Sequence, residues 1–334
     1  MSGADDIVGF LETLALFHGL CTSELENVAR IVQPFECGPG QPLFRQGADC
    51  DGMYIIRTGS VVIRARVPGD EATKLARLGP GDMLGEVALL DRGLRTATAL
   101  AVETTRGYWL GRRHFEILRL DGRPASLVIV QRLIENTCTS VRRSYARIAE
   151  LLQEAASLSR MPANNFVDLP EADAAGIPFG SLPFFSTLSP HELQELLGSG
   201  RLVHAKRGTV LYLQGARSHE VFIVVRGALR TMLRHGDANF QIAVHAPGSM
   251  VGVLGALDGQ PSATSCEACE TSTVLTLERS TIEALRGSSA PLSWNVSERI
   301  HTELVRELRK CTDHAARLEL ERHLHSRVRG AINV

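Results

Sequence analysis

Three short stretches of the chain consist of apolar, mostly β-branched residues, each bounded by a polar residue or glycine on one side and an arginine on the other. Residues 53–56, 61–63 and 221–225 follow this pattern, which predicts short β-strands. Gly59 and Gly227 interrupt the runs and predict tight turns between strands. Several short strands at close spacing are typical of a small barrel or jelly roll.

Two longer stretches have the period of a helix instead. Between Leu127 and Leu152, and again between Ile300 and Leu318, apolar residues recur at spacings of three and four. That spacing is typical of a helix with a coiled-coil-like seam, so each helix needs a partner surface. The two helices could pack together within one chain, in a pseudo-twofold arrangement, or either could hold a homodimer together.

A short amphipathic helix is predicted ahead of each strand-rich region. Thr22 is placed as the N-cap of the first helix, and Ser189 as the N-cap of the second. Glu24 and Glu192 follow inside the first turn, where a carboxylate stabilises a helix start. These helices mark where each strand-rich region begins.

The same order of signals occurs twice in the 334 residues, with an offset of about 167 positions. Each copy is therefore expected to be one domain, the first over residues 1–160 and the second over 183–334. Residues 161–182 between them carry several prolines and are predicted to be a linker. The predicted fold class is α+β, with two jelly-roll-like β-barrel domains that are each flanked by helices and followed by a long helix.

The composition excludes some classes of protein. A net charge of −1 and a pI near 6.8 give no overall attraction to nucleic acid or to an anionic membrane surface. No apolar run approaches the roughly 20 residues that span a bilayer, and the acidic start MSGADDIVGF differs from a signal peptide. The seven cysteines are scattered, as expected of reduced thiols. These features predict a cytoplasmic protein with no membrane partner.

The most specific motif is GEVALLDRGLRTATA over residues 85–99. A Gly-Glu pair is followed by a short apolar helix, a turn, and an arginine with two small residues after it. This order resembles the phosphate-binding cassette of cyclic nucleotide-binding domains, such as those of the bacterial cAMP receptor protein and of protein kinase A regulatory subunits. Gly47, Gly59 and Gly81 upstream match the turn glycines of that family. The resemblance covers roughly residues 12–150 and, more weakly, 182–320.

The chemistry of these residues suits a cyclic phosphate, which is a buried monoanion. Gly85 allows the backbone to approach the ligand, and the start of the short helix after it offers unpaired amide groups. Arg95 can give charge-assisted hydrogen bonds to the phosphate oxygens. Glu86 cannot favour a phosphate, and the resemblance assigns it the ribose 2′-hydroxyl. The predicted ligand-binding residues are Gly85, Glu86, Val87, Ala88, Arg95, Thr96, Ala97, Asn136 and Thr137.

The identity of the base depends on weaker signals. The hydroxyl of Thr96 could donate to the phosphate or reach a guanine amino group, and in some relatives a threonine there accompanies a preference for cGMP. Asn136 and Thr137 align with the helix through which the family contacts the base, although they could equally be a polar interruption of the helix seam. The frequency of ligands in the family favours cAMP, with cGMP next.

In the second copy the cassette reads GVLGALDGQPSATS, over residues 252–265. Val253 stands where Glu86 does, and with one deletion Pro261 stands where Arg95 does. Both polar anchors are absent, and a buried phosphate without a cation has an uncompensated desolvation cost. We therefore expect no ordinary nucleotide binding in this domain.

Other candidate sites are weaker. Cys266 and Cys269 fall in a predicted strand, where residues three apart point to opposite faces, so no metal site is expected. Arg226, Arg230 and Arg234 share one strand face, either as a solvated surface or as an anion-binding stripe for a cyclic dinucleotide. No local motif specifies catalysis, so neither an enzyme nor a cofactor is predicted.

The output is predicted to be a contact with an unknown downstream protein. The stretch after the second barrel is too short for the winged helix-turn-helix of the family's transcription factors, and its helix mixes charges of both signs, so DNA binding is not expected. The alternatives are a ligand-independent scaffold, a DNA-associated regulator and a cyclic-dinucleotide receptor. The leading hypothesis is a signalling protein that senses cAMP or cGMP through its first domain.

Overall fold

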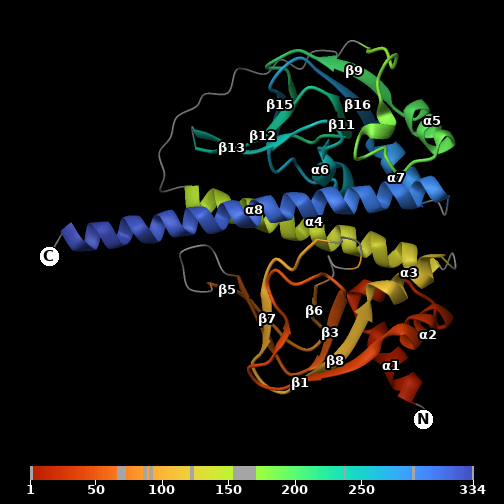
Figure 1. Cartoon of the computed structure of the whole chain (residues 1–334), viewed down its shortest axis with the longest axis vertical. Coiled ribbons are helices and arrows are strands. Elements are labelled where there is room, and N and C mark those ends of the chain that lie inside the picture. Colours follow the sequence, from red (N-terminus) through yellow and green to blue (C-terminus); the bar gives the residue numbers. More distant parts are fainter. Residues whose placement is uncertain are drawn as a thin grey trace. The chain divides into compact units, whose positions relative to one another are not determined.

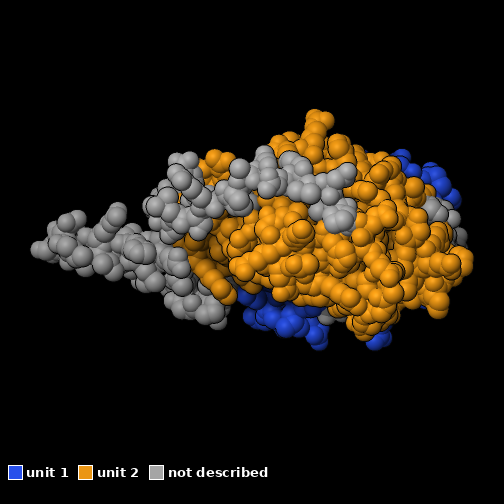
Figure 2. Space-filling model, turned by 90° about the horizontal axis from the view of Figure 1, so that it is seen from above, with its two compact units in different colours: residues 1–133 blue, residues 134–334 orange. Residues whose placement is uncertain are grey.

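The computed structural model describes residues 3–65, 73–85, 89, 93–120, 124–152, 171–236, 238–287 and 290–332. It forms two compact units, residues 1–133 and 134–334 (Figure 2). The division between Leu133 and Ile134 falls inside a helix, so that single helix begins in the first unit and continues in the second.

Eight strands in the first unit form two antiparallel sheets, with the orders β1-β8-β3-β6 and β2-β7-β4-β5 (Figure 1). The strands are β1 (Gln33–Cys37), β2 (Pro42–Phe44), β3 (Gly52–Thr58), β4 (Val61–Ala65), β5 (Thr73–Leu78), β6 (Met83–Leu84), β7 (Thr98–Ala101) and β8 (Thr105–Gly111). The helices are α1 (Gly3–Glu12), η1 (Ala15–Phe17) and α2 (Thr22–Ile31) before the strands, and α3 (Arg112–Leu120) and α4 (Pro124–Leu152) after them.

The two sheets of the first unit enclose one apolar core. Ile56 and Leu84 from one sheet pack with Val61 and Ala99 from the other, and all four are buried. Residues on both faces of β3 are buried, since the neighbours Ile55 and Ile56 are both fully covered, and this explains the continuous apolar run in the sequence.

The second unit repeats this arrangement strand for strand, with sheets ordered β9-β16-β11-β14 and β10-β15-β12-β13. Its strands are β9 (Arg201–Ala205), β10 (Val210–Tyr212), β11 (Glu220–Arg226), β12 (Leu229–His235), β13 (Ala238–His245), β14 (Met250–Val251), β15 (Ser265–Ala268) and β16 (Ser272–Glu278). Its helices are η3 (Phe179–Ser181), α5 (Pro190–Gly198), α6 (Val253–Asp258), α7 (Arg279–Gly287) and α8 (Pro291–Ile332). The predicted repeat and fold class are confirmed.

The predicted tight turns lie at equivalent places in the two units. Gly59 and Gly227 have φ of 89° and 81°, and a Cβ there would lie 2.6 Å from the Thr104 carbonyl oxygen and 2.4 Å from Ser272 Oγ, respectively. Only glycine combines this left-handed conformation with such a close approach.

The two predicted N-caps differ in outcome. Ser189 caps α5, where its hydroxyl accepts from the Glu192 amide at 3.3 Å. Thr22 was predicted one residue too late, because it is already helical: the N-cap is Cys21, whose amide donates to the Glu24 carboxylate at 3.3 Å. The glutamate three residues after the cap therefore locates the helix start better than the residue type at the cap.

Residues 161–170 of the predicted linker 161–182 lie outside the described residues. Its last part belongs to the second unit, where the Ala172 amide donates to the Leu202 carbonyl at 2.8 Å. The predicted boundaries of the two domains stay a prediction.

The two long helices predicted from the seam spacing are α4 and α8, and they contact each other within the second unit. Thr137 Oγ1 lies 3.5 Å from His301 Nε2, and Arg147 donates to Glu319 at 2.7 Å. The Tyr145 hydroxyl donates to the Glu307 carboxylate. The two helices thus pair inside one chain.

Among the described residues, no helix has the length and apolarity needed to cross a membrane.

This interface predicts a pH dependence of stability. His301 is completely buried, and burial lowers its pKa from 6.5 to about 4. Between these values the unfolded chain binds a proton that the native chain does not, so His301 destabilises the fold as the pH falls. Relative to His301→Gln, the wild-type chain should lose about 2 kcal/mol more unfolding free energy between pH 7 and pH 5. Urea denaturation of a Trp109→Phe background isolates the fluorescence of Trp294 in α8.

The matched control is His191→Gln, at an exposed position of α5. It should keep the pH dependence of the wild-type chain. Equal losses in wild type and His301→Gln would contradict the burial of a neutral imidazole at this interface.

Candidate functional site

The arginine of the first cassette, residues 85–99, lies in the interior of the first unit. Its side chain is only 2% exposed. Arg95 Nη2 donates to Asp51 Oδ1 at 2.8 Å and to the Gly52 carbonyl at 2.6 Å. The guanidinium also lies over the Phe44 ring, 4.1 Å from its centroid. One carboxylate, one carbonyl and one aromatic face therefore hold the charge.

This set leaves hydrogen-bonding capacity unused. Arg95 Nε is buried and has no hydrogen-bond partner among the described residues, and Nη1 reaches the Gly85 carbonyl only at 3.5 Å. A guanidinium has five N–H donors in a planar fork that matches the oxygens of a phosphate. The first cassette thus presents a pre-positioned cation with free donors.

Gly85 is required by the position of this cation. Its φ is +76°, and a Cβ at this residue would lie 2.1 Å from Arg95 Nη1. Any other residue would displace the guanidinium as well as strain the backbone. Gly85 and Arg95, which were predicted separately as ligand-binding residues, thus lie in direct contact.

The other predicted residues are placed as follows. Thr96, which follows Arg95 in the sequence, is exposed, and Ala97 is buried. Glu86, Val87 and Ala88 lie outside the described residues, and their roles stay predictions.

Asn136 and Thr137, the predicted base contacts, belong to the part of α4 in the second unit. Thr137 is buried next to His301. Asn136 is partly buried, and its backbone carbonyl accepts a hydrogen bond from Ser140 Oγ. Thr137 therefore contributes to the contact between α4 and α8. A role of either residue toward a base stays a prediction.

Asp51 and Phe44 were not predicted from the sequence. They lie 44 and 51 positions before Arg95, and no local pattern marks them. A comparison of the two copies contains the signal: the position of Asp51 is His219 in the second copy, which also lacks the arginine. The second copy therefore lacks both partners of the ion pair between Asp51 and Arg95.

The second cassette, residues 252–265, aligns with the first without the predicted deletion. The Gly47 amide donates to the Arg95 carbonyl, and the Gly215 amide donates to the Ser262 carbonyl, both at 2.9 Å. Ser262, not Pro261, therefore stands at the position of Arg95, while Val253 still aligns with Glu86. The correction leaves the conclusion intact, because Ser262 supplies no charge.

Side chains close the interior of the second cassette. Its cavity is only about 10 Å³, which is room for no more than about one water. Tyr212, at the position of Phe44, lines it together with Glu307 from α8. Burial raises the pKa of the Glu307 carboxyl above its ordinary value, and burial does the same for Tyr145, which donates to it. A carboxyl group at this place disfavours a phosphate.

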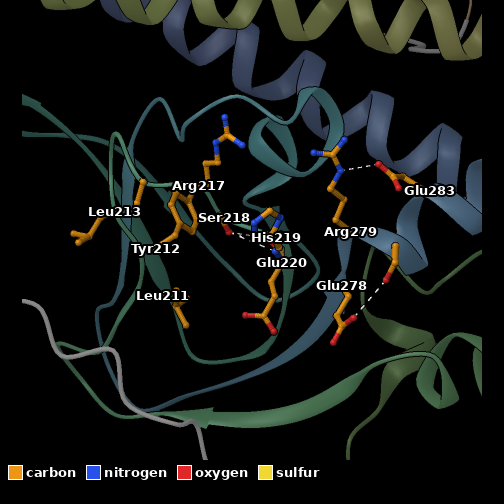
Figure 3. Close-up of a pocket in the computed structure, with 12 residues that line it drawn as sticks. Leu211, Tyr212, Leu213, Arg217, Ser218, His219, Glu220, Glu278, Arg279 and Glu283 are labelled. Carbon is orange, nitrogen blue, oxygen red and sulfur yellow. Dashed lines mark hydrogen bonds and ion pairs between the residues drawn. The ribbon is translucent and has the colours of Figure 1, made fainter.

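A larger hollow of about 660 Å³ lies outside the second cassette, between the loop at 216–219 and the start of α7 (Figure 3). Arg217 and Arg279 approach it from one side, while the carboxylates of Glu220 and Glu278 lie toward the other. Arg279 is paired with Glu283 at 2.6 Å. The mixed charges of this hollow select neither an anion nor a cation.

The prediction that Arg226, Arg230 and Arg234 share one strand face is wrong, because Arg226 ends β11 whereas Arg230 and Arg234 belong to β12. Arg226 donates to the Gly176 carbonyl at 2.6 Å and Arg234 to the Gly236 carbonyl at 3.1 Å. Arg230 forms an ion pair with Glu267. Each of the three arginines therefore has a partner within the fold, which leaves less unpaired positive charge for an anion than the sequence spacing suggested.

Parts of the chain are similar in sequence to known proteins. The chain is 42% identical over 91 residues to the cyclic AMP receptor protein of Thermus thermophilus, covering 27% of this chain and 42% of that protein. It is 37% identical over 124 residues to the acetyltransferase Pat of Mycolicibacterium smegmatis, covering 36% and 37%. In both cases the chain covers less than half of the relative's length.

Among solved structures, the regulatory domain of Toxoplasma gondii PKA with cAMP is similar at 20% identity and a TM-score of 0.34, covering 86% of this chain and 93% of that one. The family model described as cyclic nucleotide-binding domain matches residues 34–120 and 202–289, one match in each unit. These two matches span more than half of the chain. The chain belongs to the cyclic nucleotide-binding domain family and carries two such domains in tandem.

Proposed function

We propose that the chain is a sensor that binds one cyclic nucleotide in its first domain and signals through contacts with another protein. The observation that carries the proposal is the buried Arg95, which is held beside Gly85 with donors to spare. A buried cation whose Nε has no hydrogen-bond partner among the described residues is the group that a cyclic phosphate needs. The second cassette lacks this group and is filled by side chains.

Binding exchanges one anion for another. Asp51 holds Arg95 Nη2 from a position that is itself 62% exposed. A cyclic phosphate that enters beside Gly85 can take the free Nε and Nη1 donors, and it competes with Asp51 for the rest. Glu86 is proposed to accept from the ribose 2′-hydroxyl. A change in the pairing of Arg95 then changes the cassette and the helices that follow it.

The ligand is proposed to be cAMP, with cGMP as the alternative that the exposed Thr96 leaves open. The name of the Thermus thermophilus relative supports cAMP. That similarity covers only part of either protein, so the choice of purine needs direct measurement.

The output is proposed to be a protein contact rather than catalysis. The Mycolicibacterium smegmatis relative is named as an acetyltransferase, but its similarity covers 36% of this chain. The proposed role of the second domain is to hold α4 and α8 as one unit. Their contact within the chain supports an intramolecular arrangement over a homodimer through these helices.

The direct test of the site is calorimetry with cAMP and cGMP on the Arg95→Ala chain. We expect at least about a hundredfold weaker binding, because the phosphate loses the buried cation of the cassette. Arg106→Ala is the matched control in the same domain, since Arg106 is exposed and pairs with the exposed Glu36. It should bind like the wild-type chain. Equal affinity of the Arg95→Ala and wild-type chains would refute the site.

Stoichiometry tests the difference between the domains. Calorimetry should give one nucleotide per chain, because Glu307 and Tyr212 fill the second cassette. Ser262→Arg restores the missing cation but leaves Glu307 in place, so it should also bind one nucleotide. Two nucleotides per wild-type chain would show that the second cassette opens.

Gly85→Ala tests the contact between the glycine and Arg95. Gly81 provides a control with similar backbone strain, because its φ is +87° and no atom lies within 4 Å of its Cβ position. Both variants should lose about 1–2 kcal/mol of unfolding free energy for the left-handed conformation. Only Gly85→Ala should lose a further ~1 kcal/mol or more, together with nucleotide binding, because the guanidinium must move. Urea denaturation in a Trp294→Phe background follows Trp109 in this domain, and identical behaviour of the two variants would contradict the geometry.

A further inference from the structure

The second cassette contacts α4 through one arginine. Arg142 Nε donates to Asp258 Oδ2 at 2.5 Å, and Nη2 donates to Asp258 Oδ1 at 2.8 Å. Nη1 reaches a third acceptor, the Pro261 carbonyl, at 2.9 Å. The two charged side chains are 19% and 22% exposed. A two-pronged, charge-assisted contact of this kind fixes orientation as well as distance.

A second contact reaches the same cassette from its inner side. Glu307 of α8 lines the small cavity together with Gly252 and Gly255, and it accepts a hydrogen bond from Tyr145 of α4. Arg142 and Tyr145 lie three residues apart, on neighbouring turns of one helix face. One face of α4 is therefore tied to the second cassette twice, directly through Arg142 and indirectly through Glu307.

The cassette retains a feature of a movable part. Its short helix α6 lies between Gly252 and Gly259, which have φ of +82° and +66°. Glycines in this conformation at both ends allow the six residues between them to change direction without strain in a side-chain-bearing residue. Asp258, which Arg142 holds, is the last residue of that helix.

We propose that the second cassette is an intramolecular receptor for α4, in which Arg142 holds Asp258 and Pro261, and that it carries a movement of α4 into the second domain. This inference rests on the proposed function, because cyclic nucleotide in the first domain is what moves α4. The helix is continuous from Pro124 in the first unit to Leu152 in the second, so it can transmit a displacement. A family cassette that no longer receives a nucleotide thus receives a helix.

Hydrogen exchange by mass spectrometry on the full chain tests the proposal. In the wild type, saturating cAMP should change the exchange rate of the amides in α6 by at least about fivefold, which is the lower end of usual coupling between sites. Arg142→Gln should remove this response while the chain still binds cAMP. Asp258→Asn should have the same effect, and it keeps an oxygen for the Gln260 amide, which Asp258 Oδ1 accepts at 3.0 Å.

Arg147→Gln is the matched control. Arg147 lies five residues further along α4 and pairs with Glu319 at 2.7 Å, away from the cassette, and it is 46% exposed. Its variant should keep the α6 response of the wild type, and circular dichroism should show that all three variants keep their helices.

Two results would overturn the receptor proposal alone. One is an α6 response that persists in Arg142→Gln, and the other is a wild-type chain that binds cAMP by calorimetry without any change in α6. Absence of binding of both cAMP and cGMP by calorimetry would instead refute the proposed function and the receptor proposal together, so the two failures are distinguishable.

Discussion

A positive charge in the interior of the first domain is the constraint on which the rest of this molecule depends. Removing a guanidinium from water costs several kcal/mol unless partners replace the lost hydration. Asp51, the Gly52 carbonyl and the Phe44 face supply that replacement for Arg95. They do so incompletely, because Nε stays unpaired in the described part of the chain. An anion that accepts a hydrogen bond from this nitrogen would complete the replacement.

The second domain shows what happens to the same fold when that charge is removed. Ser262 replaces the arginine, and the space beside it is occupied by Tyr212 and by Glu307 from α8. The tight turns and the sheet order are the same in both domains, and the second cassette holds the short helix α6. The backbone of the second cassette is therefore formed without an arginine at position 262, and its Asp258 pairs with Arg142 of α4. We propose that one architecture holds a nucleotide in one copy and a helix in the other.

The fold was largely predictable because its signals are local and repeated. The strands, the tight turns at Gly59 and Gly227, and both long helices follow from hydrophobic period and glycine placement. The predicted N-cap Thr22 was wrong by one residue. Threonine is a preferred N-cap residue and cysteine is not, so residue type alone favoured Thr22 over Cys21. The deletion assumed in the second cassette was also wrong. The backbone hydrogen bonds of Ser262 with Gly215 and Ala216, which match those of Arg95 with Gly47 and Ala48, show that Ser262 stands at the arginine position.

The candidate site was predictable only in part, for a physical reason. Gly85 and Arg95 belong to one contiguous motif, whereas the groups that hold Arg95 come from strands and turns far away in sequence. Asp51 is an ordinary surface carboxylate until the fold brings it to 2.8 Å from the guanidinium. Similarly, Arg142 is one of many arginines on a predicted helix, and its partner Asp258 lies 116 positions later.

A crystal structure of the full chain grown with cAMP would test the central claim most directly. We predict one nucleotide, in the first domain, with its phosphate oxygens within hydrogen-bond distance of Arg95 and of the backbone at Gly85. Glu307 should remain in the second cassette, with no nucleotide there. A nucleotide bound in the second cassette, or a first cassette that stays empty with Arg95 still on Asp51, would contradict the account.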